Sequence, residues 1–145
     1  MKILVDTNVL IDVIAGREPF FDDSLKIFEF CRREIVEGAI AANSVVNITY
    51  ILRKQFALDE LRKVLLNLRK IFKIESVDDE KLVAALNDKN FSDFEDCLQT
   101  RCAINFHADY IVTRNVKDFV ASEIPAVTPA EFREILEEEK FLPTD

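Results

Sequence analysis

Residues 3–12 read ILVDTNVLID: an apolar run, a carboxylate, and then apolar residues at helical spacing. The run predicts a short buried strand that ends at Asp6. The carboxyl ends of parallel strands open into the crevice where ligands bind, so a carboxylate there is costly to bury without a partner. A hard cation is one such partner. The alternative interpretation is that Asp6 caps the helix that begins at about Val9.

The polar residues around Asp6 receive different interpretations. Thr7 and Asn8 are expected to act as helix caps or to hold the Asp6 carboxylate. Asp12 lies further along the same helical pattern, where a solvated helix face is expected.

Two later segments, residues 92–96 (SDFED) and 113–119 (TRNVKDF), are expected to meet Asp6 in space. Asp93 and Glu95 suit the first turn of a helix, where acids complement the helix dipole. Asp96 borders the buried face of that helix and points the same way as Asp93. Two like charges on a partly buried face repel each other unless a cation or a proton intervenes.

Asn115 and Asp118 follow a predicted strand at 110–112, so they too are expected at the carboxyl end of a strand. The alternative for both residues is an ordinary capped turn. The single histidine, His107, has no suitable nucleophile paired with it, and is interpreted as a loop residue rather than as part of a hydrolase triad or a zinc site.

Composition narrows the function classes. The chain has 145 residues, 49% of them hydrophobic, which suits one domain spanning 1–145. Its net charge of −8 argues against a broad cationic surface, but not against a small basic patch or a metal-filled acidic pocket. Two glycines leave no glycine-rich phosphate loop, and three cysteines without CxxC spacing suggest reduced, mostly buried thiols. With no apolar run near the ~18 residues of a membrane span and no signal peptide, a cytoplasmic protein without membrane association is expected.

Apolar runs of strand length alternate with helical patterns, which predicts a parallel sheet covered by helices on both faces. Capping boxes are predicted at Ser92 with Glu95 and at Thr128 with Glu131, and Gly38 is predicted to cap a helix end. The predicted strands are 2–5, 39–42, 72–74, 110–112 and 126–127. The predicted helices are 9–14, 20–36, 43 or 44 to 54, 59–69, 79–86, 92–106 and one from Pro129 onward.

Taken in order, five segments resemble the PIN domain, the ribonuclease fold of VapC-type toxins and PilT N-terminal-like proteins. They are DTNVLID at 6–12, NSVVNITYILRK at 43–54, DFEDCLQTRCA at 93–103, DYIVTRNVKDF at 109–119 and VTPAEF at 127–132. The resemblance implies an α/β fold, namely a three-layer α/β/α sandwich around a parallel sheet of about four or five strands.

The resemblance also implies a site. Asp6 is expected as the first metal-binding acid and Asp96 as the metal-binding acid of the later helix. Asp93 and either Asn115 or Asp118 would complete the catalytic set, and the supporting residues would be Thr7, Asn8, Asn47 and Thr113. The implied activity is Mg²⁺- or Mn²⁺-dependent hydrolysis of RNA by the toxin of a toxin–antitoxin pair. The implied partners are RNA, an antitoxin protein and a second copy of the chain, with apolar surfaces at 20–30 and 61–68.

One residue departs from the family pattern. Asn47 stands where the helix after the second strand usually carries a Glu, and Asn is the weaker ligand for Mg²⁺. The alternative function is therefore a PIN-fold module that binds RNA or protein with weak or no catalysis.

Two unrelated classes are disfavoured. A phosphotransferase of the haloacid dehalogenase type would need a second acid where this chain has Asn8. A phosphoacceptor receiver domain would need an Asp directly after the third strand, and none follows in residues 72–76.

Overall fold

The computed structural model describes residues 1–139, and in them strands and helices alternate along most of the chain. A short 3₁₀ helix, η1, lies between the fourth and fifth strands. In chain order the elements are β1 (Lys2–Val5), α1 (Thr7–Ile14), α2 (Phe21–Arg32), β2 (Glu37–Ala41), α3 (Ala42–Ile51), α4 (Leu58–Leu68), β3 (Lys73–Glu75), α5 (Asp79–Asn87), α6 (Phe94–Phe106), β4 (Tyr110–Val112), η1 (Val116–Phe119), β5 (Ala126–Val127) and α7 (Pro129–Glu138).

The strands form one parallel sheet in the order β3-β2-β1-β4-β5. β1 lies at its centre, with Ile3 opposite Gly38 of β2 on one side and opposite Tyr110 of β4 on the other. The chain therefore builds the sheet outward from β1 in one direction, and later adds β4 and β5 in the other direction.

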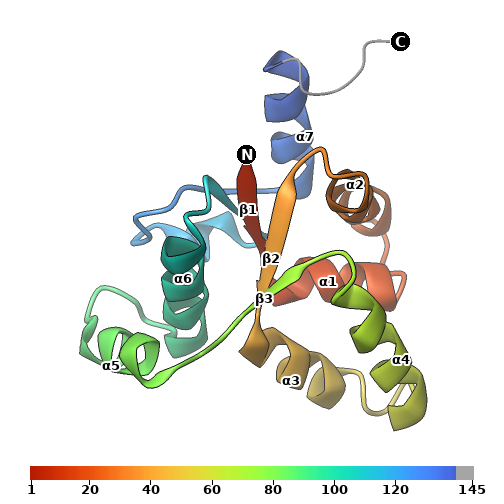
Figure 1. Cartoon of the computed structure of the whole chain (residues 1–145), viewed down its shortest axis with the longest axis horizontal. Coiled ribbons are helices and arrows are strands. Elements are labelled where there is room, and N and C mark those ends of the chain that lie inside the picture. Colours follow the sequence, from red (N-terminus) through yellow and green to blue (C-terminus); the bar gives the residue numbers. More distant parts are fainter. Residues whose placement is uncertain (140–145) are drawn as a thin grey trace.

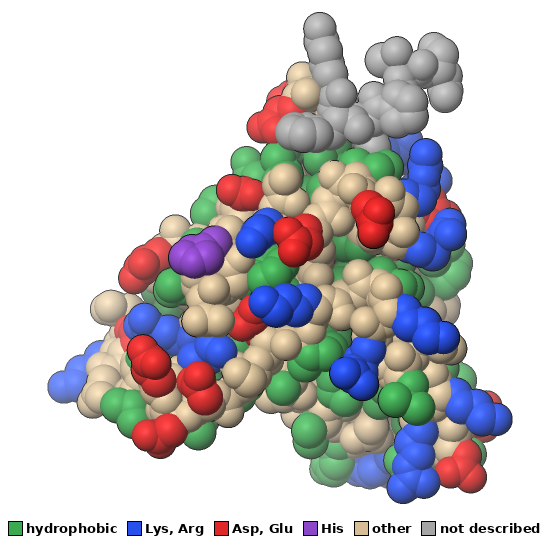
Figure 2. All heavy atoms as spheres, viewed as in Figure 1, with side chains coloured by type: hydrophobic (Ala, Val, Ile, Leu, Met, Phe, Trp, Pro, Cys, Tyr) green, Lys and Arg blue, Asp and Glu red, His purple; other side chains and the backbone are tan. Residues whose placement is uncertain are grey.

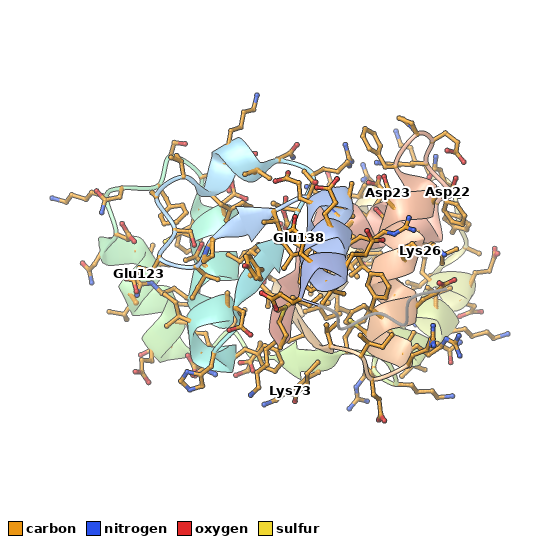
Figure 3. The ribbon with its side chains drawn as sticks, turned by 90° about the horizontal axis from the view of Figure 1, so that it is seen from above. Asp22, Asp23, Lys26, Lys73, Glu123 and Glu138 are labelled. Carbon is orange, nitrogen blue, oxygen red and sulfur yellow. The ribbon has the colours of Figure 1, made fainter. Side chains whose placement is uncertain are left out.

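Helices cover both faces of this sheet, which makes the predicted three-layer sandwich (Figure 1). Helix α6 packs on one face and carries α5 on its outer side, whereas α1, α2 and α7 pack together on the other. Viewed from above, Asp22, Asp23 and Lys26 lie on α2 and Glu138 on the neighbouring α7, in the outer layer (Figure 3).

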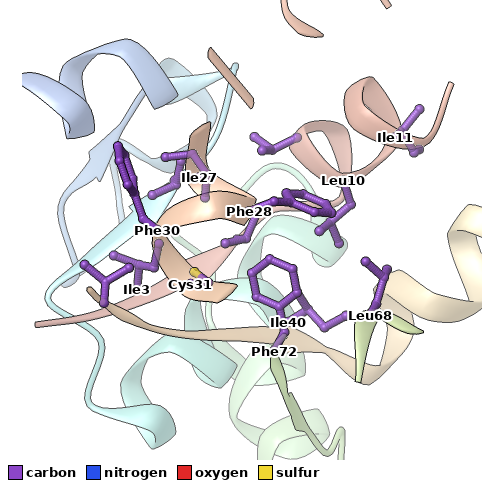
Figure 4. Close-up of a cluster of buried hydrophobic side chains, with 14 of the residues drawn as sticks. Ile3, Leu10, Ile11, Ile27, Phe28, Phe30, Cys31, Ile40, Leu68 and Phe72 are labelled. Atoms are coloured by element: carbon purple, nitrogen blue, oxygen red, sulfur yellow. The ribbon is translucent and has the colours of Figure 1, made fainter. Parts of the chain in front are cut away.

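Alternate residues of β1 serve two separate cores, as the pleat of a strand requires. Ile3 and Val5 join the larger core beneath α1, α2 and α7, where Phe28 and Phe72 meet edge to face with centroids 5.1 Å apart (Figure 4). Leu4 faces the other way and packs against Phe106 of α6. Burial on both faces explains why β1 is apolar at successive positions.

The helix predicted over 20–36 ends earlier, at Arg32, and Gly38 does not cap it. Glu34 instead adopts a left-handed conformation (φ 58°). Gly38 lies in β2, where a Cβ atom would stand 2.6 Å from Cys31 Sγ and 2.9 Å from Phe72 Cδ1. Glycine is required at this position because α2 and Phe72 pack directly against the strand.

Two other predicted caps are wrong. Helix α3 begins at Ala42 without a side-chain cap, and Ser44 is buried within it. Helix α6 is capped by Asp93 rather than by Ser92, because Asp93 Oδ1 accepts a hydrogen bond from the Asp96 N–H at 3.0 Å. The capping box at Thr128 is confirmed.

Three further predictions concern the cysteines, the histidine and membrane-spanning segments. Cys31, Cys97 and Cys102 are buried free thiols, as predicted. His107 is exposed at the end of α6. Within residues 1–139, no helix combines the length and the hydrophobicity needed to cross a membrane.

Candidate active site

An open cavity of about 310 Å³ lies where β1 and β4 end. This is the point at which the strand order reverses direction, the usual place for ligands in open α/β sheets. Five carboxylates contribute to its lining. The lining residues are Asp6, Thr7, Asn8, Ile11, Arg17, Ile51, Asp93, Glu95, Asp96, Arg114, Asn115 and Asp118.

Asp6 is the best-held acid of the cavity. Its carboxylate accepts hydrogen bonds from the Thr7 N–H (2.8 Å), from Thr113 Oγ1 (2.8 Å) and from Asn8 Nδ2 (3.3 Å). The bond from Thr7 makes Asp6 the N-cap of α1, so the capping interpretation and the site interpretation describe the same side chain. Burial nonetheless raises the pKa of Asp6 to about 6, and the charges of Glu95 and Asp118 contribute to the rise.

Asp96 is half-buried on the first turn of α6. Burial raises its pKa to about 7, and the nearby charges of Asp93, Asp6, Asp118 and Glu95 add to this effect in that order. The cavity therefore holds more negative charge than its surroundings neutralise.

Glu95 is a cavity residue that the sequence reasoning left out, because a first-turn acid has an ordinary structural explanation. Its Oε1 accepts a hydrogen bond of 2.7 Å from Asn47 Nδ2 on α3. Asn47 does not line the cavity itself, but it contacts Glu95, which does. A signal was available in the sequence, since Glu95 directly precedes Asp96.

Asn115 and Asp118 both line the cavity, from the segment that follows β4. The backbone N–H of Asn115 donates to Thr113 Oγ1 at 3.0 Å, and Asn8 Oδ1 accepts from the Arg114 N–H at 3.2 Å. These bonds fix the segment against the loop after β1. The choice between Asn115 and Asp118 as the fourth site residue stays open.

A buried polar network lies behind Asp6. Thr7 Oγ1 and Ser44 Oγ are 2.7 Å apart, and Gln99 Nε2 donates to both of them, at 3.2 and 2.8 Å respectively. These residues belong to α1, α3 and α6, so the network joins the helices that carry Asp6, Asn47 and Asp96. Thr7 thus supports the site through its backbone N–H and its hydroxyl group.

The expectation that Asp12 lies on a solvated face is wrong. Asp12 is 0% exposed, and its Oδ2 lies 2.6 Å from Nε of Arg114, which follows β4. The sequence could not indicate this pairing, because it depends on the loop after β4 covering α1.

The donor chemistry of the cavity fits a divalent cation. Carboxylate oxygens are the ligands that Mg²⁺ and Mn²⁺ prefer, and the raised pKa values of Asp6 and Asp96 indicate uncompensated negative charge. Among residues 1–139, no three His, Cys, Asp or Glu side chains are placed to hold a metal ion by themselves.

Comparison with known proteins agrees with the architecture. Residues 2–117 match the family described as PIN domain. The chain is 27% identical over 137 residues to Ribonuclease VapC1 of Aquifex aeolicus, covering 92% of this chain and 94% of that protein.

Two solved structures are similar in fold. One is VapBC2 from Rickettsia felis bound to a DNA fragment from its promoter, with a TM-score of 0.66 and 18% identity over 88% of this chain and 98% of that one. The other is a toxin–antitoxin complex from Klebsiella pneumoniae, with a TM-score of 0.62 and 24% identity over 87% of this chain and 96% of that one. The match over residues 2–117, together with the parallel sheet and its flanking helices, shows that the chain belongs to the PIN domain family.

Proposed function

We propose that this chain is a metal-dependent ribonuclease that hydrolyses RNA phosphodiester bonds, and that it is the toxin of a toxin–antitoxin pair. The observation that carries the proposal is the cavity at the β1–β4 switch point, in which Asp6, Asp93, Glu95, Asp96 and Asp118 face one another. These acids come from three separate segments, and two of the acids, Asp6 and Asp96, have strongly raised pKa values. Such an arrangement is typical of functional sites.

Asp6 and Asp96 are the proposed ligands of Mg²⁺ or Mn²⁺, assisted by Asp93, Glu95 or Asp118. When bound, the ion would activate a water molecule and offset the charge that builds on the phosphate. The chain's own contribution is orientation. Thr113 and Asn8 hold the Asp6 carboxylate, and Asp93 fixes the first turn of α6, on which Asp96 lies.

The relatives support the biological part of the proposal. One relative is named a ribonuclease, and one structural neighbour is a toxin–antitoxin complex. We therefore propose an antitoxin protein as the partner of this chain. We also propose that residues 1–145 form a single domain and that two copies associate.

The test is an RNA cleavage assay with Mg²⁺, with Mn²⁺ and with a chelator, paired with calorimetric titration of each ion. Wild-type protein should cleave only with metal. Asp6→Asn and Asp96→Asn should bind the ion weakly and cleave at background level. Thr113→Val, which removes one bond to Asp6, should lower activity by roughly 10- to 100-fold.

Glu123→Gln is the matched control, because Glu123 is exposed and does not line the cavity. Cleavage that persists in chelator, or that survives both aspartate changes, would contradict the proposal.

The alternative function is a binding module with weak or no catalysis. Its physical basis is Asn47, a neutral residue where a Glu is usual. The contact between Asn47 and Glu95 bears on this choice, because Glu95 brings a carboxylate to the place where Asn47 lacks one. Glu95→Gln should then weaken metal binding, whereas Asn47→Glu should tighten it. Wild-type protein that binds RNA and metal but never cleaves would favour the alternative.

A further inference from the structure

Arg114 pairs with none of the five carboxylates that line the acidic cavity. It lines the acidic cavity, yet its Nε forms an ion pair of 2.6 Å with Asp12, which is not a lining residue. Its guanidinium also stacks on Phe20, with Cζ 4.2 Å from the ring centroid. Arg114 is therefore held from two sides at the edge of the cavity.

This arrangement keeps a positive charge available. An unrestrained arginine beside five carboxylates would turn onto them, but the fully buried Asp12 needs a partner and so holds Arg114 more firmly than solvated acids can. Within residues 1–139, Arg114 has no other ion pair. Since the pair uses Nε, the two terminal nitrogens remain for another acceptor.

Arg17 adds a second cation to the same edge. It also lines the cavity, and its backbone N–H donates to the Asp12 carbonyl at 2.9 Å. Its charge acts on the Asp12 carboxyl group together with that of Arg114. Asp12 thus contacts both arginine residues, through its carboxylate to the Arg114 side chain and through its carbonyl to the Arg17 backbone.

Beyond Arg114, the surface offers further room for a nucleic-acid strand. A second cavity, of about 220 Å³, shares Arg114 with the first. The rest of its lining is Phe20, Asp23, Ser24 and residues 128–130. Phe20 is 38% exposed, so part of its ring remains accessible. A chain leaving the acidic cavity over Arg114 would reach an aromatic surface, a feature that suits single-stranded nucleic acid.

We propose that Arg17 and Arg114 bind a phosphodiester of single-stranded RNA, next to the one placed at the acids. A planar guanidinium matches two phosphate oxygens, and a chain of net charge −8 needs local cations to hold a polyanion. Asp12 and Phe20 are positioning residues for Arg114. The inference rests on the proposed ribonuclease function, and its test separates the two.

The experiment measures the binding of a fluorescent single-stranded RNA of about ten nucleotides in chelator, at several salt concentrations, by anisotropy. Arg17→Gln should weaken binding by roughly 3- to 10-fold and lower the slope of log affinity against log salt by about 0.7, the value for one lost phosphate contact. Arg62→Gln on α4 is the matched control and should change neither quantity, since Arg62 is an exposed arginine outside both cavities.

Arg114 needs a paired change, because Arg114→Gln alone leaves Asp12 charged, buried and without its partner, which destabilises the fold. Asp12→Asn combined with Arg114→Gln removes both charges and should again weaken RNA binding and lower the slope by about 0.7. Calorimetry with Mn²⁺ should show that metal binding is retained, which distinguishes this edge from the acids.

Unchanged RNA affinity and salt slope in both variants, or no RNA binding by the wild type, would overturn the proposal. If wild-type protein cleaves RNA but the variants bind it normally, the ribonuclease function stands and the phosphate site falls. If the variants lose binding while wild-type protein never cleaves, the phosphate site stands and the ribonuclease function falls.

Discussion

At the scale of single residues, Asp6 and Asp96 make the folded protein sensitive to pH. The pKa of each carboxyl group rises from 3.8, to about 6 for Asp6 and about 7 for Asp96, and burial is the largest cause in both cases. Between the ordinary pKa of 3.8 and these raised pKa values, the folded chain binds more protons than the unfolded chain. Stability without metal is therefore fully present below the ordinary pKa and falls as the pH rises through the raised values.

Replacing Asp96 should expose this effect. In chelator at about pH 8, above the raised pKa of about 7, Asp96→Asn should increase the free energy of unfolding by an amount on the order of 1 kcal/mol, after allowance for solvent screening. The gain should vanish toward pH 4, where wild-type Asp96 is itself neutral. Urea denaturation at both pH values measures the difference. An equal gain at both would mean that packing, not charge, is responsible.

Residue-level reasoning identified the acids whose position follows from local pattern. Asp6 follows an apolar run, and Asp96 lies at the border of a buried helix face, so both could be predicted. Glu95 and Arg114, which also line the cavity, were missed because their positions depend on contacts with Asn47 and Asp12, from segments distant in the sequence. Tertiary packing alone produces those contacts.

At the scale of elements, β2 shows how closely a helix can approach a strand. Gly38 admits Cys31 Sγ and Phe72 to positions that a Cβ would occupy. The sequence predicts a strand only from residue 39 and places Gly38 at a helix end, because glycine usually caps helices. The need for a close approach is invisible in the sequence, since it arises from α2 and Phe72 meeting the strand together.

Gly38→Ala should therefore destabilise the fold by roughly 1–3 kcal/mol, the usual range for overpacking a core. Cys31→Ala removes the sulfur atom that the new methyl group would meet at 2.6 Å. In a double-mutant cycle, Gly38→Ala should cost less in the Cys31→Ala background than in the wild type. Additive effects would show that the strand shifts away from α2 instead.

At the scale of the whole molecule, alternation of strands and helices predicted the parallel sandwich correctly. The predicted dimer surfaces are exposed only in part, at Phe20 and Leu66. Phe28 and Phe30 of α2, and Leu61 and Leu65 of α4, are buried in the core. Figure 2 shows hydrophobic side chains at the lower edge of this view, over α3. Val46 (67% exposed) and Tyr50 (65% exposed) lie one helical turn apart there.

We expect a homodimer that uses this α3 surface. Sedimentation at micromolar concentration should give about twice the 16.7 kDa chain mass. Val46→Asp should shift the population toward the monomer, because it places a charge in an apolar interface. Val120→Asp is the control, since Val120 is 88% exposed on a different segment. A monomeric wild type, or a dimer insensitive to Val46→Asp, would contradict the expectation.

The central place of β1 also has a consequence for the order of events during synthesis. β1 emerges before the other described strands, but its neighbour β4 and the Thr113 hydroxyl that holds Asp6 come 107 residues later. A growing chain cannot pair β1 with β4 until residues 110–112 have emerged, because contacts so distant in sequence form late. The acidic cavity is therefore incomplete until that point, and a chain cut short before β4 carries Asp6 without the Thr113 hydroxyl that holds it.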